Sequence, residues 1–262
     1  MDLKLKDKVA LVTGASHGLG RAVSLALAAE GAKVAVHYYH SEAKGVDLTG
    51  EAGEVVRTIT ETHGTDAFAI PGDLAIDADI PEIFRRTIER FGQIDVLVNN
   101  AGIWPTDFVK EMSLESWDYA VRVNLTAVFL TCREMVRHLT DTGRGGRIVN
   151  ISSQAAFHGA TSGHAHYAAA KGGIHQLTIS LAREVAANDI AVNVVAPGLM
   201  YTEMTKEPLS DPERKKRYIS RIPLGRIAPP EEIAKIVTFM ASDGASYMTG
   251  ATVNASGGMV MR

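Results

Sequence analysis

Short runs of apolar residues alternate along the chain with longer amphipathic stretches. Six of the runs are rich in β-branched and aliphatic side chains and contain few polar ones: residues 8–13, 33–37, 67–70, 94–99, 146–152 and 190–196. A strand that is buried on both faces shows this continuous pattern, whereas a half-exposed strand alternates apolar and polar side chains. The runs therefore predict strands at the centre of a layered fold.

The stretches between these runs have the apolar spacing of helices. They comprise residues 19–31, 79–92 and 114–139 and the segment that follows Tyr167. Gly31 and Gly92 stand where helix C-caps are expected, and Asp79 before Pro81 is typical of a helix start. Strands that alternate with helices predict a parallel α/β sheet with right-handed crossovers and helices on both faces.

The whole chain, residues 1–262, is predicted to form one domain, because no repeat, low-complexity tract or linker divides it. Two connections are longer than a crossover requires. Three glycines dilute the segment 41–64, so we expect its helix to begin late. The segment 198–225 is long and charged, and we interpret it as a lid over a site that contains a solvated helix around residues 214–217.

Composition excludes several classes of function. The formal net charge of −3 offers no electrostatic footprint for nucleic acid or for an anionic membrane. Cys132 is the only cysteine, so no intrachain disulfide can form and a reducing compartment is expected. The first residues are too polar for a signal peptide, and no apolar run reaches transmembrane length. We therefore expect a cytoplasmic protein.

Tyr167 and Lys171 lie four residues apart with only alanines between them. On a helix, this spacing puts the phenol and the ammonium on one face, one turn apart. The pair could simply decorate a helix surface. Alternatively, the ammonium could lower the pKa of the phenol, which is about 10 in water, and make it a general acid/base near neutral pH.

The sequence TGASHGLG, residues 13–20, follows the first predicted strand and opens the first predicted helix. Gly14, Gly18 and Gly20 would permit a tight turn and the close approach of a phosphate to the free N–H groups of the helix. The spacing is GxxxGxG and not the commoner GxGxxG. Its position between a strand and a helix favours a nucleotide-binding role.

Four motifs occur together in the chain: TGASHGLG, NNAG at residues 99–102, YAAAK at 167–171 and APG at 196–198. In this order and at these separations they resemble the short-chain dehydrogenase/reductase family, and in particular its ketoacyl reductase-like and glucose dehydrogenase-like members. The resemblance extends from Leu5 to the C-terminal TGATVNASGG. It implies a single-domain Rossmann fold with a seven-stranded parallel sheet, and hydride transfer between a nicotinamide cofactor and a carbonyl or alcohol.

The resemblance also implies a catalytic tetrad. Tyr167 would give a proton to a carbonyl oxygen or take one from an alcohol, and Lys171 would lower its pKa and bind the nicotinamide ribose. Ser153 would orient the substrate oxygen, while Ser152 would face the core or the cofactor. Asn124 would hold a water that relays protons from the lysine; alternatively, it is a hydrogen-bonded amide of the core.

Further residues are assigned to the cofactor by the same resemblance. Asp73 would lie near the adenine, and Thr202 would hold the carboxamide. Asn99 and Gly102 would shape the sheet and the cofactor floor near the adenosine ribose. Besides Tyr167 and Lys171, the expected set is Gly14, Ser16, His17, Gly18, Leu19, Gly20, Tyr38, Tyr39, His40, Ser41, Asp73, Leu74, Asn100, Ala101, Gly102, Pro197, Gly198 and Thr202.

The end of the second strand indicates which nicotinamide cofactor is bound. NAD-preferring members carry an acidic residue where this chain has Tyr38. The sequence HYYHS resembles the HYHRS of pteridine reductases, which use NADPH, with His40 in place of the arginine. We expect His17, His40 and Ser41 to hold a 2′-phosphate, so NADP(H) is favoured and NAD(H) is possible. Alternatively, both histidines are plain surface residues.

The substrate pocket is expected to involve Trp104, Ser153, His158 and Tyr201. Its aromatic character favours a small apolar carbonyl or secondary alcohol. No strongly basic patch indicates an acyl-carrier-protein partner, so a free small molecule is expected.

Three histidines near the catalytic motif, His158, His164 and His166, suggest a metal site only weakly, because no acidic or cysteine ligand is near them in sequence. We expect them to form hydrogen bonds or pack at the pocket edge, without a metal.

Two functions fit the fold. The first is an oxidoreductase; the second is a non-catalytic dinucleotide-binding regulatory protein that kept the fold. The complete tetrad favours the enzyme. The resemblance further implies a homotetramer joined by the helices after Leu114 and after Tyr167, while the substrate and the direction of the reaction stay open.

Overall fold

The structure, a computed structural model, describes residues 2–160 and 163–261. Within these residues, seven parallel strands lie in the spatial order β4-β2-β1-β5-β6-β7-β8. Their bounds are β1 Val9–Val12, β2 Lys33–Ser41, β4 Ala67–Gly72, β5 Val96–Asn99, β6 Gly146–Ile151, β7 Ile190–Pro197 and β8 Thr252–Ala255. The predicted parallel α/β sheet is confirmed.

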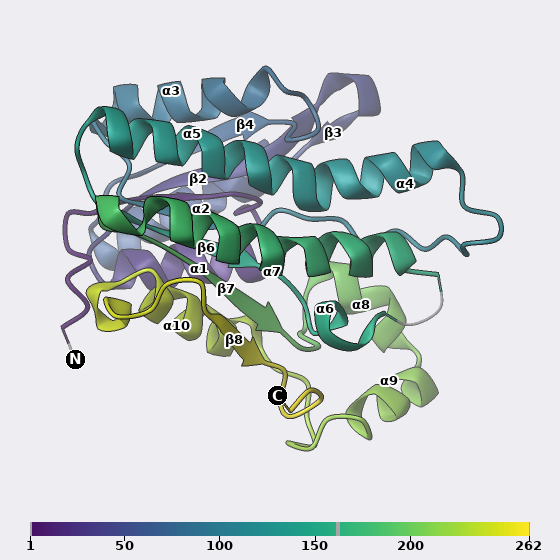
Figure 1. Ribbon diagram of the computed structural model, residues 1–262. Coiled ribbons are helices and arrows are strands. Elements are labelled where there is room, and N and C mark those ends of the chain that lie inside the picture. The colour runs from purple at the N-terminus through teal and green to yellow at the C-terminus, as the bar shows by residue number, and fades with distance from the viewer. Residues whose placement is uncertain (1, 161–162, 262) are drawn as a thin grey trace.

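Helices cover both faces of this sheet, and in Figure 1 α5 and α7 lie in front of it while α1 and α10 lie behind it. The helices are α1 Gly18–Ala29, α2 Thr49–His63, α3 Asp79–Phe91, α4 Leu114–Val121, α5 Ala127–Asp141, α6 Ala155–His158, α7 Ala165–Val185, α8 Glu203–Ser210, α9 Pro212–Ile219 and α10 Pro230–Met240. None of the helices in the described part of the chain is long and apolar enough to cross a membrane.

The residues of β1 belong to two hydrophobic clusters, one on each face of the sheet, because neighbouring strand residues point to opposite faces. Ala10 and Val12 belong to the cluster that includes α1 and α10, whereas Leu11 belongs to the cluster that includes α3 and α5. Both faces of the strand are therefore buried, and this explains why the strand sequences lack polar alternation.

The segment after β2 departs from a plain crossover. A short 3₁₀ turn, Glu42–Lys44, leads into β3, Val46–Asp47, which pairs antiparallel with the end of β2. Helix α2 then begins at Thr49, so the predicted late start is confirmed. The two-residue β3 was not predicted, because so short a strand carries no periodicity.

The predicted helix 114–139 is interrupted. Helices α4 and α5 are joined by a π-helical segment, Arg122–Thr126, which contains Asn124. Such segments are rare and occur often at functional sites. The charged segment 198–225 contains α8 and α9, which contact each other.

Candidate active site

A cavity of about 450 Å³ lies at the carboxyl ends of the parallel strands. Residues that follow β1, β4, β5, β6 and β7 line it, together with the C-terminal part of β2 and residues of the segment 198–225. The strand order runs from β1 to β2 and β4 on one side and to β5 and β6 on the other. Ligands of open α/β sheets bind at this kind of switch point.

The glycine-rich turn between β1 and α1 forms one wall. Gly14 has φ +61°, and a Cβ there would lie 2.9 Å from the Ala101 Cα. A Cβ at Gly20 would lie 2.1 Å from the Gly14 carbonyl oxygen. Glycine is therefore required at both positions. The turn leaves the N-terminus of the twelve-residue α1 open to the cavity, as a bound pyrophosphate would need.

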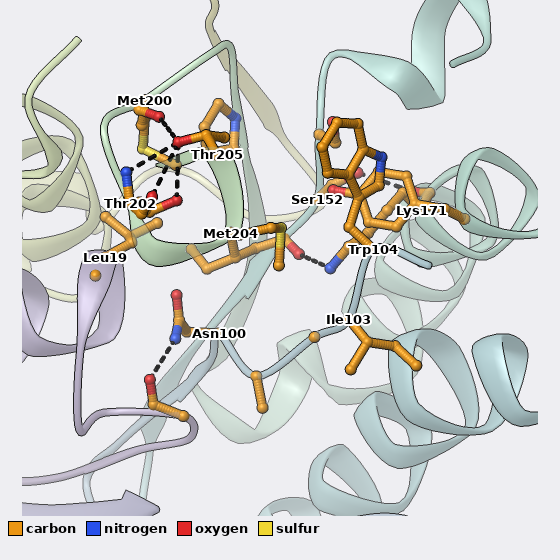
Figure 2. A pocket seen from close by; sticks show the side chains of 18 of the residues that line it. Leu19, Asn100, Ile103, Trp104, Ser152, Lys171, Met200, Thr202, Met204 and Thr205 are labelled. Carbon is orange, nitrogen blue, oxygen red and sulfur yellow. Dashed lines mark hydrogen bonds between the residues drawn. The ribbon is translucent and has the colours of Figure 1, made fainter. Parts of the chain in front are cut away.

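Buried side chains fix this turn from below. The Gly14 N–H donates to His37 Nδ1 at 3.2 Å, and His37 Nε2 hydrogen-bonds the Gly72 carbonyl at 3.2 Å. Burial lowers the pKa of His37 to about 4, so the ring is neutral and Nε2 carries the hydrogen. Asn100 Nδ2 donates to the carbonyls of Thr13 and Gly14, and Figure 2 shows this side chain below Leu19.

Asn99, in contrast, does not reach the cavity. It is buried beneath it and hydrogen-bonds Asn150 and Thr131. Asn99 therefore shapes the sheet, as expected, but does not itself line the cavity, because strand alternation turns it toward the core while Asn100 faces the turn.

Tyr167 and Lys171 both line the cavity from α7. The Lys171 side chain is 4% exposed, and Nζ donates to the Ile151 carbonyl at 2.9 Å. Burial lowers the pKa of Lys171 to about 8. Its Nζ lies 5.8 Å from the centroid of the Tyr167 ring.

The pKa of Tyr167 is raised, and not lowered as the sequence led us to expect. Burial of the phenol disfavours its charged form, and this outweighs a hydrogen bond with Ser153 that acts in the opposite direction. The phenol is therefore protonated at neutral pH. A protonated phenol can donate a proton to a carbonyl oxygen.

The two serines take different positions, in agreement with the prediction. Ser153 is partly exposed and lines the cavity beside Tyr167. Ser152 also borders the cavity but is 4% exposed; its Oγ donates to the Lys171 carbonyl at 2.9 Å and lies 2.8 Å from His175 Nε2. Ser152 and His175 therefore support the α7 backbone that presents the lysine.

Asn124 lies behind the cavity and does not line it. Its Oδ1 accepts from the Ile103 N–H at 3.1 Å, and its Nδ2 donates to the carbonyls of Ile103 and Ala120 at 3.0 Å. A Cβ at Gly102 would lie 2.8 Å from Asn124 Oδ1 and 3.4 Å from Lys171 Nζ. The space that a side chain at position 102 would fill thus lies between the amide oxygen and the lysine ammonium; the relay role stays a prediction.

The remaining cofactor residues divide into two groups. Ser16, His17, Gly18, Leu19, Tyr39, Asp73, Leu74, Ala101, Gly102, Pro197, Gly198 and Thr202 line the cavity, as expected. Tyr38, His40 and Ser41 do not. The Tyr38 hydroxyl hydrogen-bonds Thr49, and His40 Nδ1 lies 3.3 Å from Asp47 Oδ1 in the antiparallel β2–β3 pair.

Lys44 is a residue that the sequence analysis missed. From the turn before β3, its Nζ donates to the Tyr119 hydroxyl at 2.8 Å and lies 4.0 Å from Asp73 Oδ2. The ammonium is also 5.9 Å from the centroid of the Tyr39 ring. Lys44 therefore places a positive charge near Asp73. The sequence does not indicate this, because a lysine in a short charged turn is usually solvated.

Trp104 and His158 line the cavity, and their contact with the substrate stays a prediction. The Trp104 ring stacks on His164, with centroids 4.3 Å apart, and His164 Nδ1 hydrogen-bonds the Pro105 carbonyl at 2.8 Å. Figure 2 shows Trp104 and Met204 projecting toward the space in front of Lys171.

Tyr201 does not line the cavity; it is 46% exposed, and Lys215 Nζ lies 5.4 Å from its ring centroid. The expectation for Tyr201 is wrong, because the chain turns at Met200 and presents Thr202 to the cavity instead. Met200, Met204, Tyr218, Arg221 and Met259 complete this side.

Comparisons with known proteins agree with this geometry. A family model described as "Enoyl-(Acyl carrier protein) reductase" matches residues 14–260. A 3-oxoacyl-[acyl-carrier-protein] reductase of Synechocystis is 41% identical over 98% of both chains. The corresponding Staphylococcus aureus reductase is 41% identical over 97% of this chain and 98% of its own.

Solved structures are similar over the full length. One, named a "putative 2-deoxy-d-gluconate 3-dehydrogenase" from Agrobacterium tumefaciens with bound NADP, has a TM-score of 0.89 and 36% identity, covering 100% of this chain and 99% of its own. A short-chain type dehydrogenase/reductase from Mycobacterium marinum has a TM-score of 0.90 and 34% identity with the same coverage.

The chain belongs to the short-chain dehydrogenase/reductase family. It is an NAD(P)-dependent oxidoreductase that transfers a hydride between the nicotinamide and a carbonyl or alcohol group. The named relatives are reductases and dehydrogenases and give no support to the non-catalytic regulatory alternative.

Proposed function

We propose that this protein is an NADPH-dependent reductase of 3-oxoacyl substrates. The observation that carries the proposal is the apolar wall that Met200, Met204 and Met259 give the cavity lined by Tyr167 and Lys171. A protonated tyrosine suits reduction, in which the carbonyl oxygen must gain a proton. The walls formed by Met200, Met204 and Met259 suit an acyl chain better than a polyhydroxylated sugar.

The residues present fit a nicotinamide dinucleotide. Because Gly14 and Gly20 have no Cβ, the turn between β1 and α1 can form without a steric clash. The N–H groups at the start of α1 would bind the pyrophosphate. Asp73 would accept from the adenine and Lys171 would hold the nicotinamide ribose. When bound, NADPH supplies the hydride. The NADP in the Agrobacterium structure supports this choice of cofactor over NAD(H).

In the proposed reaction, the chain's own residues handle the carbonyl oxygen. Ser153 donates a hydrogen bond to that oxygen and holds it beside Tyr167, which gives up its phenolic proton as negative charge develops. The lysine cation then stabilises the resulting tyrosinate. Lys171 is largely protonated below a pH of about 8, so it carries the charge that this step requires.

The names of the curated relatives support an acyl-carrier-protein thioester as the physiological substrate. This modifies the expectation of a free small molecule. Thr202, with its side chain in a capping box at the start of α8, fixes one end of the segment 198–225, which would close over the acyl group as a lid.

The assembly and location are further parts of the proposal. Leu114, Trp117, Tyr119 and Phe129 are large and exposed on α4 and α5, which supports a homotetramer joined by these helices. The buried free thiol of Cys132 supports a reducing, cytoplasmic setting. Mass measurement by light scattering tests the tetramer directly.

Steady-state assays that follow NADPH absorbance test the reaction in both directions. The substrates are an acetoacetyl thioester, its 3-hydroxy product with NADP⁺, and 2-deoxygluconate with NADP⁺. We expect turnover of the acetoacetyl thioester to be the fastest. Turnover confined to the sugar acid would replace the proposal with a sugar-acid dehydrogenase.

A further inference from the structure

We propose that Arg221 binds an anionic group on the part of the substrate remote from the reacting carbonyl. This inference rests on the proposed function and deepens it, because it says what the substrate must carry besides a 3-oxo group. The chemistry recognised is a phosphate or a carboxylate. A phosphate would belong to a pantetheine carrier, and a carboxylate would belong to the acyl group itself.

The Arg221 guanidinium is free to bind a ligand. It lines the cavity, and among the described residues it makes no ion pair and no side-chain hydrogen bond. Most other arginines of the described chain are paired; Arg214 and Arg226, on either side of it in sequence, each have a glutamate partner. Arg214, Arg217, Arg221 and Arg226 are all exposed, and of these four only Arg221 lines the cavity.

The charges around the cavity favour an anion at this end. Besides Arg221, the fully charged side chains that line it are Asp73 and Lys171. The Asp73 carboxylate lies at the far end, where Lys44 approaches it to 4.0 Å. Lys171 is held at the Ile151 carbonyl beside the tyrosine. The substrate side therefore contains cations and no carboxylate, and it is suited to an anionic ligand.

The backbone that carries Arg221 is held in place. Its N–H donates to the Tyr218 carbonyl at 3.1 Å, directly after α9. The next residue, Ile222, is 5% exposed and packs with Leu209 and Ile227 in a small hydrophobic cluster that also contacts Met259. A side chain anchored on such a turn can reach a ligand at the cavity mouth without the whole segment being rearranged.

The residues beside Arg221 are apolar or aromatic. Tyr218, Met204 and Met259 line the same side of the cavity. An extended substrate would therefore pass along apolar walls and place its charge at the guanidinium. Since arginine binds phosphate and carboxylate through two parallel hydrogen bonds, it can fix both the position and the orientation of that group.

The test uses ligand pairs that differ only in the anion. The protein with bound NADP⁺ is titrated by calorimetry with 4′-phosphopantetheine and with pantetheine. A second pair is 3-oxoglutarate and its dimethyl ester. Both pairs are measured for the wild-type protein, for Arg221→Met, and for Arg217→Met. Arg217 is an exposed arginine of α9 that does not line the cavity, so its variant is the matched control.

We expect the wild-type protein to bind one anionic member about tenfold more tightly than its neutral partner. This preference should be lost in Arg221→Met and retained in Arg217→Met. Preference for 4′-phosphopantetheine identifies a pantetheine phosphate, and preference for 3-oxoglutarate identifies a carboxylate. Equal affinity within both pairs, or a preference that survives in Arg221→Met, overturns the inference.

Kinetics separates this inference from the proposed function. If Arg221 binds a pantetheine phosphate, Arg221→Met should raise KM for acetoacetyl-CoA about tenfold and leave kcat within twofold, whereas KM for the neutral acetoacetyl-N-acetylcysteamine should not change. If Arg221 binds an acyl carboxylate, neither KM should change, because the acetoacetyl group has no carboxylate. If neither thioester is reduced, the proposed function fails, while the calorimetric titrations still decide the role of Arg221. If both are reduced equally well by the wild type and Arg221→Met, and the calorimetric titrations show no anion preference that depends on Arg221, only the inference fails.

Discussion

His37 couples the stability of the fold to pH. Its buried ring accepts a hydrogen bond from Gly14 and donates one to Gly72, so the neutral form is required. Burial lowers its pKa from 6.5 to about 4. Between these two values the unfolded chain binds a proton that the folded chain does not, so stability falls as the pH decreases.

The size of this effect follows from the two pKa values. One pKa unit corresponds to about 1.4 kcal/mol. At pH 5, the unfolded histidine is almost fully protonated and the folded one is largely neutral, so His37 should reduce the free energy of unfolding by about 2 kcal/mol relative to pH 8. Below a pH of about 4, the loss is complete at about 3 kcal/mol.

Urea denaturation at pH 8 and pH 5 measures this effect in the wild type, in His37→Asn and in His63→Asn. His63 is the last residue of α2 and lies on its surface, and its variant serves as the control. The difference in unfolding free energy between the two pH values should be about 2 kcal/mol smaller in His37→Asn than in the other two proteins. The same pH dependence in all three proteins would refute the reasoning.

Three further outcomes are expected. Gly20→Ala should weaken NADPH binding at least a hundredfold, because the added Cβ would lie 2.1 Å from the Gly14 carbonyl oxygen. A fluorescence titration that gives an affinity within threefold of wild type would contradict this. Lys44→Met should weaken NADPH binding about fivefold by removing a cation near the adenosine end; an unchanged dissociation constant would exclude that role. His164→Ala should raise the substrate KM two- to tenfold without changing NADPH affinity, because Trp104 loses its stacking partner; an unchanged KM would show that the stack is not needed.

The sheet and its helices could be predicted because both faces of every central strand are buried. Continuous apolar runs such as residues 94–99 are the direct result of that burial. The β2–β3 pairing could not be predicted, because two residues cannot show a period. The π-helical segment around Asn124 also lacks a sequence signal, since it differs from an α-helix by a single inserted position.

The catalytic residues were found through motifs, whereas the residues around them depend on tertiary contacts. Tyr38 and Tyr39 are neighbours of the same type, and only the direction of β2 decides that Tyr39 faces the cavity. Arg221 lines the cavity from a turn, and Lys44 approaches the cavity residue Asp73 from a short 3₁₀ turn, whereas a charged residue in such turns is usually solvated. The raised pKa of Tyr167 depends on burial, which the spacing to Lys171 cannot show.

The central claim is that Tyr167 donates the proton during NADPH-dependent reduction of a 3-oxoacyl thioester. The most direct test follows NADPH absorbance with acetoacetyl-CoA for the wild type and Tyr167→Phe, with NADPH affinity measured by fluorescence in both proteins. We predict rapid turnover by the wild type, a loss of at least a thousandfold in kcat for the variant, and NADPH affinity within threefold. Turnover by Tyr167→Phe at a rate close to that of the wild type would contradict the account.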